Sequence, residues 1–121
     1  TITGLDDSKY VDKVASATKI ESNTAISITG ETDRVYTTSK GPGHPVIVSE
    51  SGKQVFEIVR DNLDNVVVWN PWTEKAKSMG DFEPKDGFQQ MICVEAGQVS
   101  GWQKLEAGET FEGSQIIRAN L

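Results

Sequence analysis

Short apolar segments rich in Val, Ile, Thr and aromatic residues recur about every ten residues from Ala25 onward, and Gly, Pro, Asn and Asp separate them. This spacing is typical of an all-β sandwich or barrel. In 121 residues there is room for one such domain, which we expect to span residues 1–121. The segments expected to form strands are Ala25–Thr29, Arg34–Thr38, Pro45–Glu50, Gln54–Arg60, Asn65–Asn70, Phe88–Glu95, Trp102–Leu105 and Gln115–Ala119.

Two of these segments carry apolar residues at consecutive positions, namely Val66–Trp69 and Met91–Val94. We expect both to lie centrally in a sheet with cover on both faces. A single thin sandwich supplies that cover poorly, so the pattern favours a part of a larger β structure. Tight hairpin turns are expected at Ser51-Gly52 and Ala107-Gly108.

Two segments favour a helix instead. Residues Asp7–Lys19 combine a candidate N-cap with Val11 and Ala15 at i,i+4 spacing, although their β-branched and Ser/Thr content argues against a helix. Residues Thr73–Met79 are compatible with a short helical turn.

Charge and cysteine content exclude several classes of function. Twelve basic and eighteen acidic residues give a net charge of −6, which disfavours nucleic acid and anionic membrane surfaces as partners. The lone Cys93 can form neither an internal disulfide nor a cysteine zinc cage, which suits a reducing cytoplasm. No nucleotide-binding, metalloprotease or hydrolase motif occurs, and the sequence indicates no cofactor and no metal. The chain begins at Thr1 without an initiator Met, so we expect that an upstream part has been removed.

Glu95 is the carboxylate that the strand pattern selects. The period of two places it on the face of Met91 and Cys93, at the end of an apolar run. Partial burial there would raise its pKa toward the range of a general base. The alternative is a strand-end glutamate that points into water.

A sugar site is the second hypothesis from the residues. Asp33 precedes a strand and could accept a hydroxyl, although an Asx turn is the alternative. Asn70 and Trp72 together offer an amide and an indole face, which is a suitable wall for a pyranose, while core packing is the alternative for Trp69. We expect the lone His44 to be solvent-exposed and Cys93 to be buried and inert.

Five motifs together carry a resemblance that none carries alone: Tyr10–Lys13, Gly30–Tyr36, Val67–Lys75, Asp81–Phe82 and Gln89–Glu95. In order and spacing they resemble the glucose-6-phosphate 1-epimerases, the hexose-6-phosphate mutarotases of the aldose 1-epimerase superfamily. The resemblance implies a β-supersandwich and an isomerase that interconverts the α and β anomers of a hexose 6-phosphate. It also implies that Glu95 is the general base and that Asp33 holds substrate hydroxyls.

The same resemblance implies what this stretch of sequence lacks. The family's general-acid histidine lies upstream of the Tyr-x-Asp-Lys motif, as do most of its phosphate-binding arginines. We therefore expect the isolated chain to be weak or inactive, and to associate with itself or with a missing N-terminal half. The alternative function is a non-catalytic carbohydrate-binding or interaction protein that uses the same half-sandwich.

Overall fold

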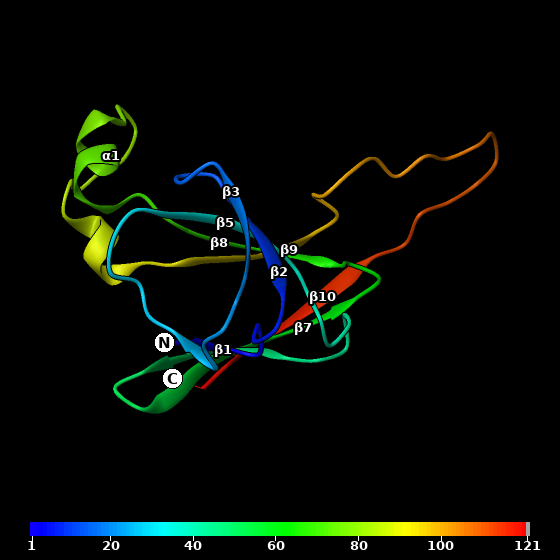
Figure 1. The fold of residues 1–121 in the computed structure, drawn as a ribbon, viewed down its shortest axis with the longest axis horizontal. Coiled ribbons are helices and arrows are strands. Elements are labelled where there is room, and N and C mark those ends of the chain that lie inside the picture. The colour runs from blue at the N-terminus through cyan, green and yellow to red at the C-terminus, as the bar shows by residue number, and fades with distance from the viewer. Residues whose placement is uncertain (121) are drawn as a thin grey trace.

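The computed structural model describes residues 1–120 and consists of two antiparallel five-stranded sheets packed as a sandwich (Figure 1). This confirms the predicted all-β sandwich. The first sheet has the order β10-β7-β6-β1-β4 and the second the order β3-β2-β5-β8-β9. Their bounds are Ser114–Ala119, Lys53–Asp61, Val46–Glu50, Ile2–Thr3 and Ala25–Ile26 in the first sheet, and Ala17–Ile20, Lys9–Asp12, Thr32–Thr37, Asn65–Asn70 and Cys93–Gly97 in the second.

The two helical elements lie at one end of the second sheet. Helix α1 spans Trp72–Ser78 and the 3₁₀-helix η1 spans Gly87–Gln90, so both occur between β8 and β9. In Figure 1 they sit at the opposite end from the segment 98–113, which extends away from the sandwich. Within residues 1–120, no helix is long and apolar enough to span a membrane.

The core forms where the inner faces of the two sheets meet. On β8, Val66 and Val68 are fully buried against residues of the first sheet such as Ile2 and Val46. The alternate residues of β8 therefore point to the outer face of the second sheet, because successive side chains of a strand point to opposite sides. This alternation decides which side chains of β5, β8 and β9 are available to a ligand.

A polar network is also buried between the sheets. Glu21 is 3% exposed, and its carboxylate accepts hydrogen bonds from the Tyr36 hydroxyl at 3.0 Å and from the Asn23 backbone and side chain at 3.1 and 2.8 Å. The Arg34 guanidinium lies 3.7 Å from the same carboxylate and 5.1 Å from the centre of the Tyr10 ring. Burial alone would raise the pKa of Glu21, but these hydrogen bonds and the Arg34 charge lower it.

The helix predicted over Asp7–Lys19 is wrong, since β2 and β3 form an antiparallel hairpin there. The Asp12 carboxylate accepts the Ala15 N–H at 2.9 Å, which closes a local turn, and Ser16 has a φ of 51°. A left-handed residue of this kind ends a helix and suits a hairpin turn. The β-branched residues on either side then favour strands.

The strand predictions are mostly confirmed, with β8 matching at both ends and Ser51-Gly52 joining β6 to β7. The segment Phe88–Glu95 is corrected, because its first residues form η1 and the strand begins only at Cys93. Strand β9 is also an edge strand of the second sheet among residues 1–120, where a central one was expected.

The other corrections concern cover and the late part of the chain. The described residues form only two layers, so the outward Val67 and Trp69 side chains of β8 are half-buried rather than covered. No strand forms at Trp102–Leu105, and Trp102 is 100% exposed. A turn does form at Ala107-Gly108, closed by the Glu109 N–H to the Glu106 carbonyl at 3.0 Å, but it joins no strands.

Candidate functional site

The outer face of the second sheet brings together residues from three neighbouring strands. Asp33 on β5 pairs with Trp69 on β8, which pairs with Cys93 on β9. In the next row, two residues along, Val67 pairs with Glu95. Asp33, Trp69 and Glu95 therefore share one face, opposite to the core residues of the same strands. Two strand spacings and two residues along the strand separate the α-carbons of Asp33 and Glu95 by roughly 12 Å.

Glu95 lies where the period of two predicts it, on the face of Cys93. Its side chain is exposed, which matches the alternative of a strand-end glutamate and not the partial burial that would raise the pKa of a general base. The Cys93 thiol is half-buried, and burial raises its pKa, with a further contribution from the negative charge of Glu95. Cys93 is therefore a poor nucleophile, and its position two residues before Glu95 places both side chains on the same face of β9.

Asp33 lies within β5 and not in a turn, so the Asx-turn alternative is wrong. Its side chain is half-buried and stands beside Trp69 in the same row. Its backbone carbonyl accepts the N–H of Lys13 at 2.8 Å, which extends the ladder by one residue beyond β2. Successive side chains of a strand point to opposite faces, so Lys13, opposite Asp33, falls on the outer face as well, and it is exposed. Sequence reasoning did not select Lys13, although its position after the alternating run of β2 carried that signal.

Asn70 ends β8 and is 2% exposed. Its side-chain amide donates to the carbonyls of Phe88 at 2.8 Å and Met91 at 3.0 Å, and its Oδ1 accepts the backbone N–H of Trp72 at 2.9 Å. Both amide protons are thus used within the protein. The structure places this predicted sugar-binding residue beneath the site and not at its surface.

Trp72 begins α1 and is half-buried. Its φ of 57° is uncommon for a bulky residue, and its ring packs on Phe88 with a centroid distance of 5.3 Å and an interplanar angle of 54°. Trp69 is half-buried on the outer face of the sheet. Both indoles therefore keep some surface available for contact with a ligand.

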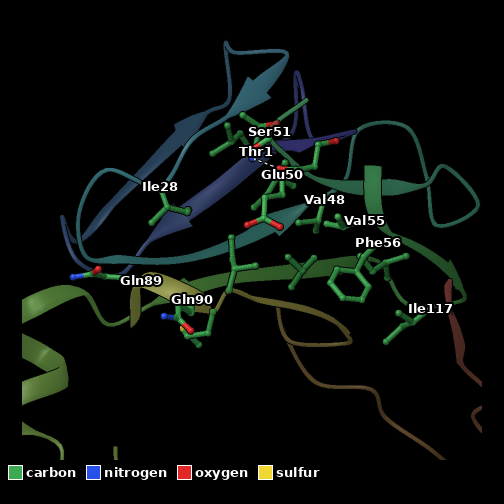
Figure 2. A pocket seen from close by; sticks show the side chains of 17 residues that line it. Thr1, Ile28, Val48, Glu50, Ser51, Val55, Phe56, Gln89, Gln90 and Ile117 are labelled. Carbon is green, nitrogen blue, oxygen red and sulfur yellow. Dashed lines mark hydrogen bonds between the residues drawn. The ribbon is translucent and has the colours of Figure 1, made fainter. Parts of the chain in front are cut away.

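A cavity of about 660 Å³ lies elsewhere, between the two sheets (Figure 2). Ile92 and Val94 line it from the η1–β9 side, whereas Glu95 belongs to the opposite face of β9. Polar groups occur at its rims, with Glu50 and Ser51 at one and Gln89 and Gln90 at the other. The cavity is otherwise mostly aliphatic and does not contain the predicted catalytic carboxylate.

The lone histidine of the sequence lies apart from this face. His44 lies in the loop that enters β6 of the first sheet and is half-buried, whereas solvent exposure was expected. Across the described positions, no group of three or more His, Cys, Asp or Glu side chains is arranged to hold a metal ion.

Comparison with known proteins relates the chain to one family. A family model described as aldose 1-epimerase matches residues 1–118. A Cenchrus ciliaris protein named "Putative glucose-6-phosphate 1-epimerase" is 33% identical over 98% of this chain, and an Escherichia coli (strain K12) protein of the same name is 32% identical over 98%. The chain covers 35% and 39% of their lengths, so it spans little more than a third of these curated relatives.

Proposed function

Because this chain belongs to the aldose 1-epimerase family, we propose that it supplies the general base and part of the sugar-binding face of a hexose-6-phosphate mutarotase. The observation that carries the proposal is the register of the second sheet, which aligns Asp33, Trp69 and Glu95 on one face. Three strands far apart in sequence contribute one residue each. A carboxylate base, a hydroxyl acceptor and an aromatic wall are the groups that anomer exchange on a pyranose requires.

In the proposed reaction, Glu95 removes the proton of the anomeric hydroxyl while an acid protonates the ring oxygen. The bond between the anomeric carbon and the ring oxygen breaks, and the resulting aldehyde rotates about its bond to the next carbon. Reversal of the proton transfers closes the ring on either face. Each positioned proton transfer contributes about 10²- to 10⁴-fold to the rate.

The described outer face contains no histidine to act as the acid, since the lone histidine of the sequence, His44, lies beside the first sheet. We therefore expect the 121-residue chain by itself to bind sugar and to catalyse weakly. The second half of the acid–base pair would come from a histidine outside this sequence, as the resemblance implies.

The substrate class follows from the groups beside the base. Asp33 accepts sugar hydroxyls, and the accessible parts of the half-buried Trp69 and Trp72 side chains pack against the apolar face of the pyranose. The net charge of −6 repels a phosphate on average, so a local cation is needed for a phosphorylated sugar. The exposed Lys13 next to Asp33 is the described group that suits this purpose.

The proposal is tested by titrating the isotope-labelled chain with glucose 6-phosphate and with glucose, and following amide and indole NMR signals. We expect the largest shifts on β5, β8 and β9 around Asp33, Trp69 and Glu95, and tighter binding of the phosphorylated sugar. Two-dimensional exchange spectra of the sugar measure the anomer exchange rate, which Glu95→Gln should lower and Glu74→Gln on the exposed side of α1 should not. Shifts confined to the cavity between the sheets would contradict the assignment of the site.

A non-catalytic carbohydrate-binding protein is the second candidate function. The observation that favours it is the exposure of Glu95, because a water-exposed carboxylate is a weaker base than a partly buried one. This alternative predicts that glucose binds as tightly as glucose 6-phosphate. It also predicts that no anomer exchange above the uncatalysed rate is observed.

A further inference from the structure

The end of β8 joins three parts of the chain that the sequence separates. The turn into α1 begins at Trp72, η1 contains Phe88, and Met91 leads into β9. The side-chain amide of Asn70 is hydrogen-bonded to all three, through the contacts with Trp72, Phe88 and Met91 described above. Removing this single amide would therefore release three segments together.

The bond to Trp72 stabilises a strained backbone. A left-handed conformation is unfavourable for a residue with a Cβ, because the Cβ comes too close to the following carbonyl oxygen, and Trp72 has a φ of 57°. The Asn70 Oδ1 accepts the N–H two residues later, which is the geometry of an Asx turn and offsets this strain. Pro71 lies between them, with a φ of −69°, so the turn is restrained on both sides.

The hydrogen bond from Asn70 to the Met91 carbonyl acts on the strand that carries Glu95, β9. Cys93 and Glu95 follow Met91 by two and four residues, and among residues 1–120 β9 has a partner on one side only, β8. An edge strand with a single neighbour is held by fewer ladder hydrogen bonds, so its starting position depends more on such side-chain contacts. The Asn70 amide therefore fixes where β9 begins to pair.

We propose that Asn70 is a positioning residue that sets the indole of Trp72 and the strand carrying Glu95 relative to each other, and that it does not touch the sugar. The inference rests on the proposed function, since it concerns the same site. It assigns Asn70 a role different from the sugar contact expected from the sequence. The physical reason is its burial, because both amide protons and the oxygen already have protein partners.

The chain contains a matched control at the other end of the same strand. Asn65 is 1% exposed, donates to the Tyr36 carbonyl and the Thr37 hydroxyl at 3.3 Å, and accepts two backbone N–H groups at 2.8 Å. It is therefore a buried asparagine with the same type of loop-holding role, away from Trp72. A variant at this position removes a buried amide of the same kind and leaves every hydrogen bond of Trp72 in place, so it is a control for the Trp72 signal.

The experiment compares Asn70→Ala with Asn65→Ala in chains labelled with 5-fluorotryptophan, whose fluorine signals are assigned by single Trp→Phe substitutions. In Asn70→Ala we expect the Trp72 signal to shift or broaden, and the Kd for glucose 6-phosphate to rise by about tenfold or more, because misplacement near 1 Å is that costly in a preorganised site. In Asn65→Ala we expect the Trp72 signal to stay unchanged, because none of the Asn65 hydrogen bonds reaches Trp72.

The outcomes separate the inference from the proposed function. If the unsubstituted chain binds no sugar, the proposed function fails, and a moved Trp72 signal in Asn70→Ala alone still supports the positioning role. An unmoved Trp72 signal together with unchanged sugar affinity overturns the inference. If Asn70→Ala does not fold, amide exchange in the unsubstituted chain decides: a protected Trp72 N–H supports the role, and exchange at the rate of an open loop overturns it.

Discussion

Replacement of Glu21 by Gln tests the buried network between the sheets. The substitution keeps the volume of the side chain and removes its charge. One oxygen becomes an NH₂ group, which then faces either the donors of Asn23 or the hydroxyl of Tyr36 and the guanidinium of Arg34. The second orientation is the better one, because the Tyr36 hydroxyl can rotate to accept, but it leaves Arg34 without its carboxylate.

The expected loss of stability follows from these contacts. A hydrogen bond to a charged group contributes about 1.5–3 kcal/mol net. The Arg34 side chain is 27% exposed, so water compensates it in part, and we expect a loss of about 2 kcal/mol in the free energy of unfolding. With an unfolding entropy of about 2.1 cal/mol/K per residue, a chain of 121 residues loses about 8 °C in Tm.

The stability difference between the original chain and Glu21→Gln should depend on pH, in a direction set by the pKa of Glu21. The pKa of Glu21 is lowered in the folded protein, so its stabilising contribution is full above the ordinary value of 4.5 and is lost as pH falls through the lower folded value. The gap between the original chain and Glu21→Gln should therefore be widest near neutral pH and shrink in acid. Urea unfolding followed by circular dichroism at a series of pH values measures both quantities.

A surface substitution provides the control. Glu74→Gln removes an exposed carboxylate that pairs with Lys77 at 3.0 Å on α1, and it should change stability by less than about 0.5 kcal/mol at any pH. A loss below about 1 kcal/mol for Glu21→Gln, or a loss that does not vary with pH, would refute the reasoning about the buried carboxylate.

Three further predictions follow from other parts of the fold. Glu95→Gln should speed alkylation of Cys93 at fixed pH by about threefold, because the carboxylate charge contributes to raising the thiol pKa; equal rates would contradict their proximity. Arg60→Met should destabilise the chain by about 2 kcal/mol and speed hydrogen exchange in loops 38–44 and 62–64, since this buried guanidinium donates to both; unchanged exchange would count against it. Phe56 and Ile117 are 37% and 57% exposed, so sedimentation should show association that Phe56→Ser/Ile117→Ser reduces, whereas a monomer at high concentration would exclude it.

The sequence predicted best what depends on local alternation and turn chemistry. The bounds of β8 and the shared face of Cys93 and Glu95 follow from a period of two, which holds wherever a strand forms. The hairpin at Ser51-Gly52 follows from residues that accept a positive φ, which are 49° and 78° here. Such features need no knowledge of distant contacts.

The sequence failed where a distant or side-chain contact decides the structure. The segment Asp7–Lys19 forms strands because β2 pairs with β5, which lies about twenty residues further along the chain. The role of Asn70 was equally hidden, since its amide bonds to residues 18 and 21 positions away. Local sequence gives the amide a polar character but does not reveal whether protein or ligand satisfies it.

Strand β5 couples the stability of the core to the proposed site. Asp33 points outward beside Trp69, and the next residue, Arg34, points inward to the Glu21 network. A change in the network can therefore reach the sugar-binding face through the backbone of one strand. If Glu21→Gln weakens sugar binding by more than the small fraction of unfolded chain explains, β5 has shifted, and the core network helps to position Asp33. If sugar binding is unchanged while stability falls, the two faces of β5 are independent, and the site depends on the end of β8 alone.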